Sequence, residues 1–304
     1  MKRPCATNRH TPMTALARAR LQLLGAALLF STGGAVIKSC SLSSWQVASF
    51  RSAVAALYFV LVFPQTRRRW SGRTLLVGAT YAACLSLFVI GTKLTTAANT
   101  IFLQSTAPLY VSLLAPWLLG ETTSRRDLLF MGVLGGGLAM LLLGAEPASA
   151  TAPNPPVGNV VGALSGVMWA LTLMGLRGTA VGAARGTDPS GAAIVCGNVI
   201  AFAVCLPLAL SAPAGGRLSD WLMIVYLGSV QIGAAYTLLN RAVQRVPALE
   251  AALLLLLEPV LNPLWAWVVH GERPGIWSLA GGVVILGATV AKAIAGTQSS
   301  DPGR

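Results

Sequence analysis

Long apolar runs alternate with short polar connectors along almost the whole chain. Each run has about the 20 residues that an α-helix, rising 1.5 Å per residue, needs to cross a hydrocarbon core of about 30 Å. Within a run the apolar residues are continuous, which excludes the alternating strands of a membrane β-barrel. The pattern predicts an all-α membrane protein with ten transmembrane helices, near residues 20–38, 46–64, 74–93, 98–119, 128–144, 158–176, 191–211, 220–239, 248–269 and 275–294.

The composition supports a membrane location. Of the 304 residues, 55% are hydrophobic and only 10% are charged, whereas about 25% of the residues of a soluble domain carry a charge. A chain so poor in charge cannot cover a globular surface with polar groups. We therefore expect its outer surface to contact the lipid bilayer.

The basic residues fall on one side of the predicted membrane. The formal net charge is +13, but Lys and Arg are spread over many connectors and do not cluster on one element, which argues against a nucleic-acid partner. With the N-terminus in the cytoplasm, 17 of them lie inside, four lie outside and Arg51 lies within a span. This asymmetry predicts cytoplasmic N- and C-termini. The excess of Arg over Lys hints at a bacterium, and hence at the cytoplasmic (inner) cell membrane.

Polar stretches divide the chain into five segments. No convincing A-x-A cleavage site follows the first apolar run, so we expect Leu21–Lys38 to be a permanent span and not a signal peptide. The longest uncharged connector is rich in Pro, Ala and Thr and separates two groups of five spans. The predicted segments are a cytoplasmic basic tail (1–20), a first five-helix repeat (21–144), an extracytoplasmic linker (145–157), a second five-helix repeat (158–295) and a cytoplasmic tail (296–304).

The two groups of spans share a sequence pattern. Pro108 precedes Glu121 by thirteen residues, and Pro259 precedes Glu272 by the same distance, at an offset of 151 residues. Both intervals are apolar and end in Gly-Glu. The two glutamates end their spans in matching positions, and we expect structural roles for them.

A second pair of intervals repeats nearer the start of each group. Phe30 precedes Lys38 by eight residues, and Trp169 precedes Arg177 by eight residues. Because each copy has five helices, an odd number, the two copies must have opposite topology. Such inverted repeats are typical of secondary transporters, which expose one site alternately to the two sides of the membrane.

Segments of both copies resemble the EamA-type, ten-helix members of the drug/metabolite transporter (DMT) superfamily. In the first copy these are LGAALLFSTGGAVIK (24–38), residues 48–57 and APLYVSLLAPWLLGE (107–121). In the second copy they are GALSGVMWALTLMGLR (162–177) and LEPVLNPLWAWVVHGE (257–272). The chain departs from the family at Phe30, where Trp is frequent, and in reading Ala-Pro in the first copy and Glu-Pro in the second.

This resemblance extends over residues 20–295. It implies secondary transport of a small metabolite by alternating access, often the efflux of amino acids or related compounds. It also suggests a homodimer formed through the fifth and tenth spans.

Glu258 is an ionisable group inside a predicted span, and such groups are costly there and often functional. It directly precedes Pro259, which leaves a backbone carbonyl one turn earlier without its N–H donor. Asn262 follows four residues later and should point to the same face. We hypothesise that Glu258 lines a cavity and takes up a proton during transport. The alternative is a structural hydrogen bond to a neighbouring helix.

Arg51 lies about one and a half turns from the outer end of the second span. Its long side chain could extend to the interface. Alternatively, it binds a carboxylate of the substrate or pairs with Glu258.

Several other polar or aromatic groups lie inside predicted spans. The polar ones make either an interhelical hydrogen bond or a substrate contact, and Trp169 offers either a stacking surface or core packing. These further candidates are Gln104, Asn198, Gln231, Tyr110, Tyr236 and Trp169, with Pro108 and Pro259 as expected helix breaks.

The sequence offers little for other classes of function. The five cysteines show no ligand spacing, and there are only two histidines, so we expect no metal site, no cofactor and no disulfide framework. A membrane-embedded enzyme would need a nucleophile with a base at membrane depth, and none is visible. A Walker A motif, GxxxxGK[ST], is also missing. A channel or a non-transporting scaffold remains the alternative to a transporter.

Overall fold

The computed structural model describes residues 15–67, 70–118, 124–144, 147–181, 189–213, 215–242 and 245–298. Over these ranges every regular element is a helix, so the prediction of an all-α protein is confirmed there. Glu121, Cys5 and His10 lie outside the described residues, so the role expected for Glu121 has no structural counterpart to compare.

The first half of the chain begins with a helix that is interrupted at Thr32 and ends with one that follows a polar connector. Its elements are α1 (Ala15–Ser31), α2 (Gly33–Ser39), α3 (Ser44–Val62), the short 3₁₀ helix η1 (Pro64–Arg67), α4 (Gly72–Leu94), α5 (Ala97–Gln104), α6 (Ala107–Leu118) and α7 (Arg125–Leu143).

The second half contains a long helix, two continuous shorter ones and two composite ones. Its elements are α8 (Pro155–Val181), α9 (Pro189–Ser211), α10 (Leu218–Val225), the π-helix η2 (Tyr226–Ala234), α11 (Ala235–Ala242), α12 (Ala248–Leu255), α13 (Leu257–His270) and α14 (Ile276–Gln298).

Nine helical stretches of the described chain are long and apolar enough to cross a membrane, against the ten predicted. The difference falls on the run predicted at 98–119. There α5 has 8 residues and α6 has 12, because Ser105 and Thr106 interrupt the helix. Neither piece is long enough to span a bilayer alone.

Two helices break at corresponding points of the sequence pattern. The break between α5 and α6 precedes Pro108, and the break between α12 and α13 precedes Pro259. The residues at the breaks, Ser105 and Leu256, are 151 positions apart and have nearly the same backbone angles, φ −67° and ψ −7° against φ −63° and ψ −11°. Proline explains both interruptions, because it cannot donate the intrahelical hydrogen bond and its ring crowds the preceding turn.

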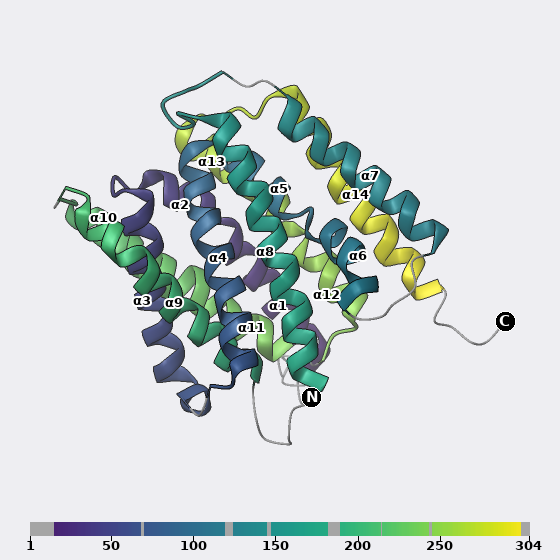
Figure 1. The fold of residues 1–304 in the computed structure, drawn as a ribbon, viewed down its shortest axis with the longest axis horizontal. Helices are drawn as coiled ribbons and strands as arrows, with labels where there is room; N and C mark the ends of the chain where they lie inside the picture. Colours follow the sequence, from purple (N-terminus) through teal and green to yellow (C-terminus); the bar gives the residue numbers. More distant parts are fainter. Residues whose placement is uncertain are drawn as a thin grey trace, which may run out of the picture.

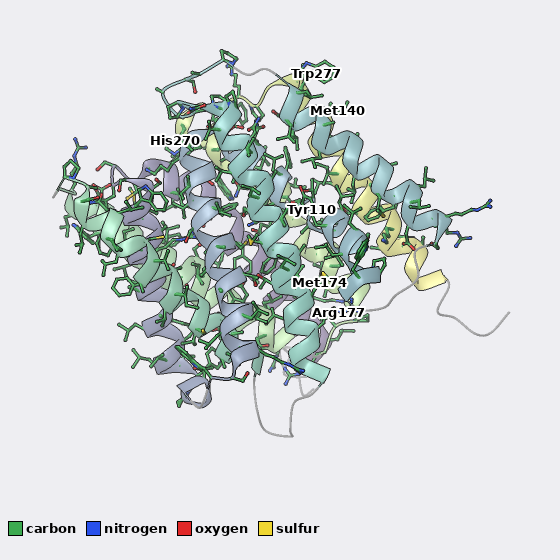
Figure 2. The ribbon with its side chains drawn as sticks, in the orientation of Figure 1. Tyr110, Met140, Met174, Arg177, His270 and Trp277 are labelled. Atoms are coloured by element: carbon green, nitrogen blue, oxygen red, sulfur yellow. The ribbon has the colours of Figure 1, made fainter. Side chains whose placement is uncertain are left out.

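These two broken helices run in opposite directions through the bundle. His270, the last residue of α13, lies at one end of the molecule in Figure 2, and Arg177 of α8 lies at the other. We call these the His270 end and the Arg177 end. The backbone N–H of Ala97, the first residue of α5, donates to the Glu272 carboxylate, so α5 starts where α13 finishes.

Helices α7 and α14 lie side by side along one flank of the bundle (Figure 1). Their backbones approach closely at Gly137, where an added Cβ would lie 2.8 Å from Ile285 Cγ1 and 3.1 Å from the Gly281 carbonyl oxygen. Small residues permit this close approach between helices in a membrane.

Replacing Gly137 by Ala should therefore loosen the contact between α7 and α14. Overpacking of this kind typically costs about 1–3 kcal/mol, which corresponds to a fall in the melting temperature of about 2–10 °C for a chain of this size. The measurement is the thermal unfolding midpoint of the purified protein in detergent.

The matched control is Gly135→Ala in the same helix, where an added Cβ meets nothing within 4 Å. Alanine favours a helix over glycine by up to about 1 kcal/mol, so this variant should be unchanged or slightly more stable. Equal losses in the two variants would contradict the close approach at Gly137.

Candidate functional site

A cavity of about 260 Å³ lies between helices from both halves of the chain. It is lined by Phe30, Arg51, Tyr81, Cys84, Leu85, Phe88, Gln104, Trp169, Gln231, Ile232, Tyr236, Leu239, Leu255 and Glu258. Six of the residues singled out in the sequence are therefore brought together here: Arg51, Gln104, Trp169, Gln231, Tyr236 and Glu258.

Arg51 supplies a positive charge to this cavity from α3. Its side chain is buried, with 2% of the residue exposed. One terminal nitrogen donates to the Leu85 carbonyl oxygen at 3.0 Å, and Nε has no hydrogen-bond partner among the described residues. A buried guanidinium whose donors are incompletely used is costly unless an anion satisfies it. The outward extension considered for this side chain is not adopted.

Glu258 supplies the opposite charge from the first turn of α13, directly after the helix break. The ion pairs among the described residues are Arg20–Glu250, Lys38–Glu272 and Lys292–Asp127. Arg51 and Glu258 thus line one cavity without pairing with each other. Both charges are available to a third group.

Aromatic rings form much of the remaining wall. Tyr236 contacts Phe30 edge to face, with ring centroids 5.1 Å apart, and lies 6.2 Å from Tyr81. Tyr81 in turn lies 6.4 Å from Trp169. Rings arranged in this way offer flat apolar surfaces and negative ring faces to a bound organic cation.

Two glutamines add hydrogen-bonding groups. Gln104 Nε2 donates to Ser165 Oγ at 2.9 Å, which ties α5 to α8. Gln231 Nε2 donates to the Phe30 carbonyl oxygen at 3.3 Å, next to the break between α1 and α2, while its Oε1 accepts no hydrogen bond within the part of the chain that the structure describes. Gln231 belongs to the π-helix η2, a geometry that often occurs at functional sites.

Three predicted candidates do not line the cavity. Asn262 is buried against Gly34 of α2, and neither Nδ2 nor Oδ1 of its amide forms a hydrogen bond with a described residue. Asn198 is buried in α9 and donates to the Ile194 carbonyl oxygen at 2.9 Å. Tyr110 is carried by α6 (Figure 2). Asn262 differs from the expectation because four residues of helix raise it about 6 Å beyond Glu258.

Helix α4 contributes three residues to the wall that were not expected from the sequence: Tyr81, Cys84 and Phe88. A tyrosine within an apolar run was the available signal for Tyr81. Cys84 and Phe88 follow it at intervals of three and four residues, so the three share one face of α4.

No group of three His, Cys, Asp or Glu side chains in the described ranges is placed to hold a metal ion. Cys40, Cys84, Cys196 and Cys205 are buried and free.

Comparison with known proteins gives a consistent result. The sequence profile of the EamA-like transporter family matches residues 18–143 and 156–291. Two strains of Pseudomonas aeruginosa have proteins named pseudopaline exporter CntI that are 28% and 27% identical to this chain over 280 residues, covering 88% of this chain and 92% of theirs.

A crystal structure shares the fold, with a TM-score of 0.60 and 22% sequence identity over 94% of this chain and 100% of its own. The resemblance identified from the sequence is confirmed, and it makes the protein a multi-pass membrane transporter. The chain belongs to the EamA-like transporter family.

Proposed function

We propose that this protein is a secondary active exporter of a small zwitterionic metabolite, such as an amino acid or a related compound, which binds in the cavity between Arg51 and Glu258. One observation carries the proposal: two opposite charges, which form no ion pair with each other or with another described residue, line one aromatic-walled cavity. A carboxylate would accept charge-assisted hydrogen bonds from the guanidinium, and an ammonium group would donate to Glu258. The pseudopaline exporters support export as the direction of transport.

We infer that the transporter has ten spans arranged as two inverted five-helix repeats. The broken helices α5–α6 and α12–α13 run in opposite directions and support this arrangement, as do their matching breaks. Residues in equivalent positions of the two copies, Phe30 with Trp169 and Gln104 with Leu255, line the same cavity. In this arrangement α5 and α6 together make the fourth span.

We assign the Arg177 end to the cytoplasm. Of the described basic residues, those exposed at this end outnumber those exposed at the His270 end, and positive charge favours the cytoplasmic side. The first group is Arg18, Arg20, Arg73, Arg125, Arg126, Arg177, Arg241 and Arg245, and the second is Arg217 and Arg273. This orientation places both termini in the cytoplasm.

A homodimer through α7 and α14, the fifth and tenth spans, remains part of the proposal. Both helices expose large apolar side chains, including Leu129 and Val283. Gly132, Gly136 and Gly287 would also accept a Cβ without contact within the chain. Another helix can approach closely at such positions.

Glu258 offers a means of coupling export to protons. If a proton and the ammonium group of the substrate compete for one carboxylate, each turnover exchanges one for the other. The substrate would then leave as a proton binds, and the proton would be released when the site faces the cytoplasm again.

Binding of a zwitterion can be tested by thermal shift of the purified protein. Free amino acids should raise the melting temperature, by about 5–10 °C at a concentration 100 times Kd, since binding at that level adds about 2.7 kcal/mol. Methyl esters lack the carboxylate and N-acetyl derivatives lack the ammonium group, so both should have much smaller effects.

Arg51→Gln should abolish the response to free amino acids, whereas Arg217→Gln, at an exposed position outside the cavity, should retain it. Comparison of acids with esters on the unaltered protein remains decisive if the Arg51 variant does not fold. Equal shifts from acids and esters would argue against recognition of a carboxylate.

Proton coupling can be tested with Glu258→Gln in proteoliposomes. At saturating substrate the variant should still exchange labelled for unlabelled substrate across the membrane, because the cavity is intact. An imposed pH gradient should no longer accelerate net flux, since the group that exchanges protons is gone. A variant that responds to the gradient as the unaltered protein does would show that the coupling group lies elsewhere. Flux without saturation or exchange in the unaltered protein would indicate a channel.

A further inference from the structure

A buried ion pair lies at the His270 end, outside the cavity. Lys38 Nζ, on α2, lies 2.9 Å from Glu272 Oε1, two residues after the end of α13. The two side chains are 2% and 4% exposed. The other two ion pairs of the described chain have side chains that are 31–49% exposed, so this pair alone among them is withdrawn from solvent.

The pair also holds neighbouring segments together. Lys38 Nζ donates to the Thr95 carbonyl oxygen at 2.8 Å, at the corner between α4 and α5, and to the carbonyl oxygen of Thr151, before α8. Glu272 Oε2 accepts a hydrogen bond of 2.8 Å from the Ala97 backbone N–H. Four separate segments therefore converge on two charges.

The two charges come from different halves of the chain. Lys38 belongs to the first sequence repeat and Glu272 to the second. The residue that occupies the position of Lys38 in the second repeat is Arg177, which is exposed at the opposite end of the molecule (Figure 2). Equivalent basic residues are thus buried at one end and solvated at the other, so the two ends are in different states.

An ion pair is physically suited to a contact that must open and close. Burial removes water from both charges, and this cost offsets much of their attraction. When such a contact separates into water, both charges regain hydration, so the open and closed states differ little in free energy. An apolar contact of equal size would expose apolar surface to water on opening, and no gain in hydration would offset that cost.

We propose that Lys38 and Glu272 form the outer closure of the transport path, and that they must separate for the substrate to leave. The assignment of this end to the outside rests on the proposed function. The closure itself rests on the buried pair, on the four segments that it joins, and on the exposure of Arg177 at the other end.

Cys84 provides a reporter that needs no substrate, because this natural cysteine lines the cavity. In a protein with Cys84 as its single cysteine, a membrane-impermeant maleimide added to intact cells should react slowly. Glu272→Gln keeps an acceptor for Ala97 but removes the charge, and Lys38→Met removes the other charge. Either change should open the closure and speed labelling of Cys84 by about tenfold or more.

The charge-reversed double variant Lys38→Glu with Glu272→Lys should restore slow labelling, a result that general unfolding would not give. Two matched controls accompany it. Lys292→Met breaks an exposed ion pair elsewhere and should leave labelling unchanged. Cys196, which is buried against Gly78 and does not line the cavity, should stay unreactive as the single cysteine in every variant.

Inverted membrane vesicles separate this proposal from the assigned orientation. If the accelerated labelling appears in vesicles and not in cells, the pair is a closure but the end is cytoplasmic. If neither single variant changes the labelling rate from either side, while its melting temperature stays near that of the parent, the closure is disproved.

If the single variants do not fold, the closure can be tested with cysteines at positions 38 and 272 of an otherwise cysteine-free protein. A short bifunctional methanethiosulfonate should join them and stop substrate exchange in proteoliposomes, and a reductant should restore it. Thermal shift by bound substrate should survive the cross-link, since the cavity can be filled from the other end. Unchanged exchange after complete cross-linking would overturn the proposal, whereas a lost thermal response would count against the binding site.

Discussion

The hydrocarbon core offers no partner for backbone N–H and C=O groups, and this constraint shapes the whole molecule. Helices satisfy their own backbone, so the described chain is helical throughout its regular elements. Interruptions are tolerated only where protein or an internal cavity surrounds them. The breaks at Thr32, Ser105 and Leu256 follow this rule, because Phe30, Gln104 and Leu255, each one or two residues before a break, line the cavity. The places where the fold is least regular are those that build the site.

Charge is used in two different ways inside the bundle. At the cavity, Arg51 and Glu258 face a shared space without meeting, which leaves their energetic cost to be offset by a ligand. At the His270 end, Lys38 and Glu272 meet directly and exclude water. In the proposed mechanism the two arrangements have different tasks, because the open pair binds the substrate and the closed pair controls its release.

Much of this could be anticipated from the sequence, and the exceptions have physical causes. Apolar runs predicted nine of the helical stretches, and the remaining run, near 98–119, is split at Ser105 and Thr106, because Pro108 removes an intrahelical hydrogen bond there. No proline lies near Thr32 in the sequence, so the helix break there was not predicted. Intramembrane charge pointed to Arg51 and Glu258, but helical periodicity alone could not show where the cavity ends, so Asn262 was expected too near Glu258. The pairing of Glu272 with Lys38 could not be predicted either, because the two residues are more than two hundred positions apart in the sequence.

The π-helix η2 has a consequence for how this protein can vary. A π-helical turn holds more residues than the 3.6 of an α-helix, and Gly228 and Gly233 fit this wide segment against Val54 and Tyr58 of α3. An α-helix needs fewer residues per turn, so the loss of one residue from Tyr226–Ala234 would be largely absorbed by a return to α-geometry. Tyr236 would then stay in the wall of the cavity, whereas the same loss from a segment that is already α-helical rotates every later side chain by about 100°. Natural selection should therefore tolerate a change of length in this stretch more readily than in the α-helices around it.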